Sequence, residues 1–108
     1  MPTDQLDAAS VTTRANVYFG GKCVSHSLIL PDGTKKSVGV ILPATLTFNT
    51  SAAEIMECVA GACDYRLAGS EAWLTSNAGE KFNVPAQSAF DIRVAEEHAA
   101  YHYICHFA

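Results

Sequence analysis

The stretch GEKFNVPAQSAFDI, residues 79–92, combines a turn signal with short runs in which apolar and polar residues alternate. Gly79 opens the segment, Pro85 interrupts it, and Phe90 and Ile92 stand two residues apart after the interruption. Alternation with a period of two is typical of β-strands that bury one face, and proline ends such strands. The segment therefore predicts two short strands that are separated by a turn.

Turn residues separate short strand-like runs along most of the chain. Short β-rich runs recur at about 8–12 residues, and helical periodicity is nearly absent. The sequence PDG at residues 31–33 predicts a hairpin turn, and Pro43 breaks the next run. Roughly eight to ten short strands in residues 15–108 predict an all-β single domain, a closed antiparallel barrel or jelly roll. Residues 1–14 are polar and predict a flexible N-terminal tail.

Composition limits the classes of protein to which the chain belongs. Its 108 residues are 49% hydrophobic and 17% charged, which is typical of one globular domain. The net charge of −4 argues against a nucleic-acid-binding surface, which needs clustered Lys and Arg. No apolar run approaches the roughly 20 residues that span a bilayer, and the polar start is unlike a signal peptide. We expect a soluble cytoplasmic protein without membrane or nucleic-acid partners.

The four cysteines, Cys23, Cys58, Cys63 and Cys105, suggest disulfides or a zinc site only weakly. No two of them form a C-x2-C pair, and the spacing of Cys58 and Cys63 is not a common zinc pattern. All four lie in apolar, strand-like runs. We therefore expect buried free thiols.

The positions of the glycines and of Pro85 resemble those of the cupins, which are small jelly-roll barrels with two metal-binding motifs. Three positions at which cupins place histidine ligands hold other residues, namely Thr45, Thr47 and Phe90. Of the four ligand positions only Glu54 keeps a donor. Because a transition metal needs three or four N, O or S donors, we predict that the pocket holds no metal.

Four segments make the resemblance narrower than cupin: ANVYFGGK, SVGVILPATLTFNTSAAEIMECVAG, GEKFNVPAQSAFDIRV and YHYICHF. In this order they resemble the pyrimidine/purine nucleoside phosphorylase family of small bacterial cupins, over residues 16–107. The final segment departs from the family, whose members often carry Arg or Ser where His106 stands. The resemblance implies a homodimeric pentosyltransferase without a cofactor. Such an enzyme uses phosphate as a co-substrate and cleaves purine and pyrimidine nucleosides to free base and ribose 1-phosphate.

Two residues are candidates for a catalytic role in that reaction. If Glu54 keeps its cupin orientation, it points into the barrel and holds ribose hydroxyls or stabilises positive charge at C1′. Thr47 offers a hydroxyl to phosphate or ribose. The alternatives are a carboxylate at the rim paired with Lys or Arg for Glu54, and an ordinary strand threonine for Thr47.

Five residues are candidates for substrate binding. Ser37 is predicted to contact phosphate, and Phe82 and Phe90 to stack on the base, which fits breadth of base choice because every base has a π-face. Tyr18 and Tyr103 are predicted to bring phenolic hydroxyls to sugar or phosphate. The alternative for each is a structural role, a solvated strand serine for Ser37 and barrel core for the phenylalanines.

The roles of His102 and His106 stay open, since they share one face of the last predicted strand, either as a functional pair or as half-exposed residues. An alternative function for the whole chain is a non-catalytic cupin that binds a small molecule. A metal-dependent dioxygenase or isomerase is disfavoured by the missing ligands.

Overall fold

The structure is a computed structural model, and it describes residues 3–107. Residues 1–2 of the predicted tail and residue 108 of the predicted domain lie outside the described residues. The strands are β1 (Ser10–Val11), β2 (Asn16–Tyr18), β3 (Cys23–Ile29), β4 (Lys35–Ile41), β5 (Ala44–Asn49), β6 (Glu54–Leu67), β7 (Leu74–Asn77), β8 (Lys81–Val84), β9 (Ala89–Val94) and β10 (Tyr101–Phe107). Two short 3-10 turns, η1 (Phe19–Gly21) and η2 (Glu96–His98), complete the described elements.

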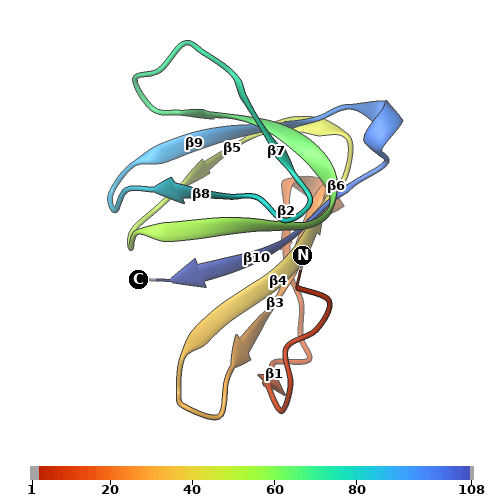
Figure 1. The fold of residues 1–108 in the computed structure, drawn as a ribbon, viewed down its shortest axis with the longest axis vertical. Coiled ribbons are helices and arrows are strands. Elements are labelled where there is room, and N and C mark those ends of the chain that lie inside the picture. Colours follow the sequence, from red (N-terminus) through yellow and green to blue (C-terminus); the bar gives the residue numbers. More distant parts are fainter. Residues whose placement is uncertain (1–2, 108) are drawn as a thin grey trace.

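The strands form one curled antiparallel sheet in the order β1-β3-β4-β10-β6-β9-β5. Strand β2 pairs with β3, and both β7 and β8 pair with β6. Figure 1 shows this succession from β5 and β9 at the top to β1 at the bottom, with β6 near the middle. The prediction of an all-β antiparallel fold is confirmed. Within residues 3–107, no helix is long and apolar enough to cross a membrane.

Strand β6 connects two parts of the sheet, because its two halves pair with different strands. Its first half pairs with β8 and β10, and its second half pairs with β7 and β9. The bend lies at Gly61, which has a left-handed backbone (φ +74°). A Cβ at this position would lie 2.0 Å from the carbonyl oxygen of Ala100, so only glycine fits the bend.

The concave side of the curl is the core. Its largest fully buried side chains include Tyr101, Ile41 and Ile92, which come from three different strands. All four cysteines are buried and free, which confirms the prediction of free thiols. The core therefore consists of the apolar strand faces that the alternation in the sequence predicts.

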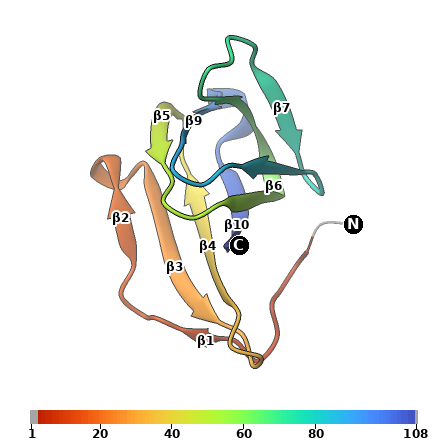
Figure 2. The same cartoon turned by 90° about the vertical axis from the view of Figure 1, so that its left-hand side faces the viewer.

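The curl is a half-barrel, so the predicted barrel or jelly roll is open on one side. In the described residues no backbone ladder joins β5, at one edge of the sheet, to the β1–β3 edge. Side chains make the contact instead: Phe19 of η1 lies edge-on to Phe48 of β5, with ring centroids 5.3 Å apart. Figure 2 shows the tip of the β2–β3 hairpin beside β5.

The segment before β2 lies along the outer side of the sheet. Ser10 and Val11 pair with Ile29 and Leu28 of β3, and the Thr3 hydroxyl donates a hydrogen bond to Glu57 of β6. The division into a flexible tail and a domain at residue 15 stays a prediction.

Candidate active site

A cavity of about 380 Å³ lies in the concave side of the half-barrel. This size is within the usual range for small-molecule sites. Its lining comes from seven of the strands and η1, and consists of Tyr18, Phe19, Ser25, Ser37, Ile41, Thr47, Phe48, Asn49, Glu54, Met56, Phe90, Tyr103, Cys105 and Phe107. One wall is aromatic, and the rest carries hydroxyl, carboxyl, amide and thiol groups.

Six of the seven residues singled out from the sequence line this cavity: Tyr18, Ser37, Thr47, Glu54, Phe90 and Tyr103. The seventh, Phe82, is 5% exposed and lies behind the wall. Its ring stacks on Tyr65 at 3.7 Å between centroids and meets Phe90 edge-on at 6.1 Å. Phe82 therefore supports Phe90 from the core and presents no face to the cavity.

Glu54 is the first residue of β6, and its side chain reaches the cavity beside Cys105 of β10. Burial raises the pKa of Glu54, and a hydrogen bond with Cys105 opposes that rise. Burial and the neighbouring Glu54 carboxylate raise the pKa of Cys105 far above its usual range, so its thiol stays protonated and donates. No salt bridge joins Glu54 to a Lys or Arg of residues 3–107.

Tyr103 is positioned by a glycine on the neighbouring strand. Gly39 of β4 lies opposite Tyr103 of β10, and a Cβ on Gly39 would lie 2.7 Å from the phenolic oxygen. The phenol lies 3.6 Å from the Cys23 sulfur. Burial raises the pKa of Tyr103 well above its usual range, so the phenol is a neutral hydrogen-bond donor at physiological pH.

The Thr47 hydroxyl is engaged on the exposed face of β5. It donates to Oδ1 of Asp91 at 2.6 Å, and Oδ2 of Asp91 accepts from Arg66 at 2.8 Å. On the other face of the same strand Leu46 is buried and Phe48 is half-buried against the core. The residue that projects an apolar side chain into the cavity from β5 is therefore Phe48.

Eight lining residues were not predicted from the sequence: Phe19, Ser25, Ile41, Phe48, Asn49, Met56, Cys105 and Phe107. The alternation T-L-T-F at residues 45–48 contains the signal for Phe48, because its apolar members mark the buried face. Comparison with cupin ligand positions instead drew attention to the threonines. Cys105 and Phe107 share a strand face with Tyr103, so period-two alternation would also have found them.

The cavity contains no basic residue among those that line it in the described chain. Its one ionisable carboxyl is Glu54. In residues 3–107, no group of three or more His, Cys, Asp or Glu side chains is placed to hold a metal ion. The chemistry available from these residues is hydrogen bonding, proton transfer and aromatic contact.

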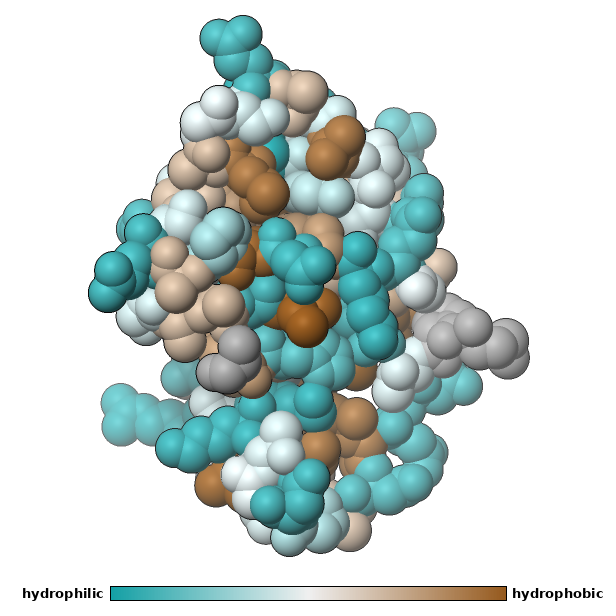
Figure 3. Space-filling view, turned by 60° about the vertical axis from the view of Figure 1, so that its left-hand side comes forward, coloured by the Kyte–Doolittle hydropathy of each residue, from teal (hydrophilic) through white to brown (hydrophobic). Residues whose placement is uncertain are grey.

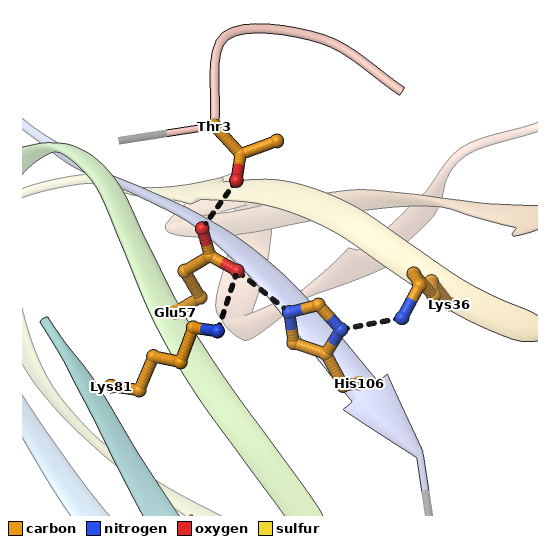
Figure 4. Close-up of polar contacts among 5 residues, drawn as sticks. All are labelled: Thr3, Lys36, Glu57, Lys81 and His106. Carbon is orange, nitrogen blue, oxygen red and sulfur yellow. Dashed lines mark hydrogen bonds and ion pairs between the residues drawn. The ribbon is translucent and has the colours of Figure 1, made fainter. Parts of the chain in front are cut away.

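A second polar cluster lies on the convex face of the sheet, across four adjacent strands (Figure 4). Nε2 of His106 donates to Oε1 of Glu57 at 2.8 Å, and Lys36 Nζ donates to Nδ1 of His106 at 2.5 Å. Lys81 lies 3.9 Å from the same Glu57 oxygen, and Thr3 donates to the other at 2.7 Å.

The cluster places His106 outside the cavity, in contact with Glu57, a residue that is only 5% exposed. His102 is exposed on the same strand and borders a different groove. The two histidines therefore do not act as a pair of ligands.

Comparison with known proteins agrees with the motifs. Residues 13–107 match the model of the family described as pyrimidine/purine nucleoside phosphorylase. The chain is 73% identical over 107 residues to a pyrimidine/purine nucleoside phosphorylase of Polaromonas sp. strain JS666, covering 99% of each chain.

Solved structures agree on the fold. The chain is 42% identical to a protein of unknown function from Acinetobacter sp. ADP1, with a TM-score of 0.91, covering 96% of this chain and 98% of that one. The EutQ protein of Clostridium difficile matches at 15% identity, with a TM-score of 0.63, over 79% of this chain and 61% of that one. That second likeness concerns the fold alone. The chain belongs to the pyrimidine/purine nucleoside phosphorylase family.

Proposed function

We propose that this protein is a metal-independent pentosyltransferase that cleaves purine and pyrimidine nucleosides with inorganic phosphate. The observation that supports this function is a cavity with two unlike sides, in a chain whose relatives are named for this activity. Phe48, which packs on Phe90, forms an apolar side that suits a base. Ser37, Glu54 and Tyr103 form a hydrogen-bonding side that suits ribose and phosphate.

In the proposed reaction, a phosphate oxygen forms a bond to C1′ of the ribose while the bond from C1′ to the base nitrogen breaks. The electron pair of the broken bond goes to the base, which takes up a proton. Holding phosphate and nucleoside together in one cavity supplies much of the rate. No step in this scheme needs a metal ion.

Glu54 is the proposed source of the proton for the departing base. Its pKa is raised by burial, which keeps the carboxyl protonated to higher pH than an exposed glutamate. A protonated Glu54 also suits a cavity that receives phosphate without a basic residue in its lining. After transfer, the carboxylate is reprotonated from solvent.

Ser37 and Tyr103 are the proposed hydrogen-bond donors to phosphate and ribose. Both come from adjacent strands, β4 and β10, and both side chains are largely buried. Neutral donors hold an anion without the large desolvation cost of a buried ion pair. Thr47 remains a candidate only if its hydroxyl leaves Asp91, with which it is bonded in the structure.

The test is incubation of the purified protein with inosine or uridine, with and without phosphate, and detection of free base and ribose 1-phosphate. Release that depends on phosphate supports a phosphorylase, whereas release without phosphate indicates a hydrolase. EDTA is expected to leave the rate unchanged, and elemental analysis checks for bound metal. Glu54→Gln is expected to lower the rate, with Glu71→Gln, on an exposed loop, as the matched control.

A second candidate function is a binding protein that holds a nucleoside or similar molecule without cleaving it. The lack of a basic residue in the cavity lining favours this alternative, because phosphate then has no charged partner there. Calorimetry separates the two: a nucleoside that binds but gives no product at high protein concentration with phosphate present identifies a binder.

A homodimer is also part of the proposal, and a second groove suggests where it forms. This groove, of about 760 Å³, lies between residues 3–11 and the convex face of β3, β4 and β10. Half-buried valines line it, including Val24, Val38 and Val40. By contrast, on the face drawn in Figure 3 hydrophobic residues lie in small groups separated by hydrophilic ones.

Light scattering at several concentrations tests the dimer, and Val38→Asp is expected to shift it toward monomer. A cytoplasmic location also stays a prediction, in keeping with four cysteines that are all free. Fractionation of cells that express the tagged protein tests the location.

A further inference from the structure

The hairpin that joins β2 to β3 places Phe19 at the mouth of the cavity, and the backbone of this hairpin has an unusual conformation. The Lys22 amide donates to the Phe19 carbonyl at 3.2 Å across Gly20 (φ +63°, ψ +26°) and Gly21 (φ +97°). These angles are those of a type I′ turn, which requires positive φ at both central residues and so explains the glycine pair. A type I′ turn does not require a positive φ at the residue before its two central residues.

Phe19, the residue before the glycines, also has a left-handed backbone, with φ +52°. For a bulky side chain this conformation is unfavourable, because the Cβ lies too close to the backbone. Backbone strain of this kind persists where the surrounding structure enforces it, and it gathers at functional sites. The conformation therefore calls for a reason in what the side chain does.

Burial of the Phe19 ring is not that reason, since the side chain is 47% exposed. The ring instead lines the cavity at its edge and meets Phe48 edge-on, at an interplanar angle of 79°. Phe48 in turn stacks on Phe90 at 5.4 Å, and Phe90 is only 3% exposed. Phe90 therefore has little surface left for a ligand, whereas Phe19 has a large one.

We infer that Phe19 is a substrate-binding residue that stacks on the nucleobase at the mouth of the cavity. The inference rests on the proposed function for the identity of the ligand. It transfers to Phe19 the stacking role that the sequence suggested for Phe82 and Phe90. A stacking contact on a phenyl ring accepts purines and pyrimidines alike, so this one residue provides breadth of base choice.

The β2–β3 hairpin fixes the ring in place for this role. The Leu42 amide donates to the Lys22 carbonyl at 2.8 Å, which ties the end of the turn to the corner between β4 and β5. On the other side, the edge contact with Phe48 sets the orientation of the ring. A ring held before the ligand arrives loses less conformational entropy on binding.

Calorimetric titration with inosine and with uridine, in the absence of phosphate, tests the inference without relying on turnover. Phe19→Ala is expected to weaken the binding of both nucleosides by about 5- to 150-fold, the range for loss of one base-stacking contact. Phe19→Tyr keeps a ring and is expected to bind nearly as well as the wild type. Val17→Ala is the control, because Val17 is exposed on the same hairpin but does not line the cavity.

Ribose 1-phosphate, which lacks a base, distinguishes a base contact from a general collapse of the cavity. Phe19→Ala is expected to bind it as the wild type does. Equal weakening for ribose 1-phosphate and the nucleosides would overturn the inference, as would unchanged binding of nucleosides. A wild type that binds nucleosides but does not cleave them would remove the proposed function alone, and a wild type that binds none would overturn both.

Discussion

Replacement of Gly61 by alanine should destabilise the protein more than replacement of any glycine at an exposed turn. Two costs add at this position. The left-handed backbone, at φ +74°, costs alanine about 1 kcal/mol relative to glycine. The new methyl group would also lie 2.0 Å from the Ala100 carbonyl oxygen, where real contacts almost never fall below 3.0 Å.

Relief of that clash requires the backbone of β6 to move away from Ala100 by roughly 1 Å, within a core that is close-packed. Movement would disturb the bend between the two halves of β6 and the pairing of Gly61 with Tyr101. We expect a total loss of about 4 kcal/mol, a size reserved for severe mutations. For a chain of 108 residues this corresponds to a fall in Tm of roughly 15–30 °C.

The measurement is thermal and urea unfolding followed by circular dichroism, with Gly33→Ala as the matched control. Gly33 has a similar backbone, at φ +87°, but a Cβ there would meet nothing within 4 Å. The control should therefore lose only about 1 kcal/mol. If Gly61→Ala loses no more stability than Gly33→Ala, the steric account of the bend is refuted.

Three other predictions concern the cavity and the cluster on the convex face. Glu54→Gln should lower kcat/KM by about 100-fold or more, the usual effect of removing a general acid. Because burial raises the pKa of Glu54, wild-type activity should fall as pH rises through that raised pKa, and a pH profile should show this fall disappear in the variant. Tyr103→Phe keeps the ring beside Gly39 and removes the phenolic hydroxyl, so it should lower kcat/KM by about tenfold with little change in the circular dichroism spectrum; an unchanged rate would count against a role for this phenol. Burial would raise the pKa of Glu57, but hydrogen bonds from Thr3 and His106, with the charge of Lys81, lower it. The stabilisation by Glu57 is therefore present above its ordinary pKa and lost as pH falls through the lowered value. His106→Ala should cost about 1–3 kcal/mol at pH 7 and less in acid, once Glu57 is protonated, as measured by urea unfolding, and equal losses under both conditions would contradict this account.

Much of the fold could be predicted from the sequence because turn residues and alternation act locally. PDG at residues 31–33 and Pro85 mark turns whatever the rest of the chain does. The bend in β6 could not be predicted in this way. Gly61 reads as an interruption between two strands, and only its contact with Ala100, 39 positions later, shows that one strand continues through it.

The candidate site was predictable where a residue and its strand face agree, as for Glu54 and Tyr103. At β5 the comparison with metal ligands pointed to Thr47, which lines the cavity but bonds to Asp91, and it passed over Phe48, which the alternation marks. Phe82 is aromatic and lies on the inward face of its strand, as the cavity residues do. Its ring stacks on Tyr65 and lies behind the cavity wall. Which aromatic residue keeps an open face is set by tertiary packing and is not encoded in local spacing.

The open edge of the half-barrel has a consequence for how molecules reach the cavity. A closed barrel must break hydrogen bonds between neighbouring strands before a ligand can enter from the side. Here, within residues 3–107, an edge-on ring contact of Phe19 on Phe48 lies between the two edges in place of a ladder, and it is worth about 1 kcal/mol. Because no strand ladder closes this edge in the described residues, a ligand can enter the cavity beside the hairpin tip without breaking hydrogen bonds of the sheet.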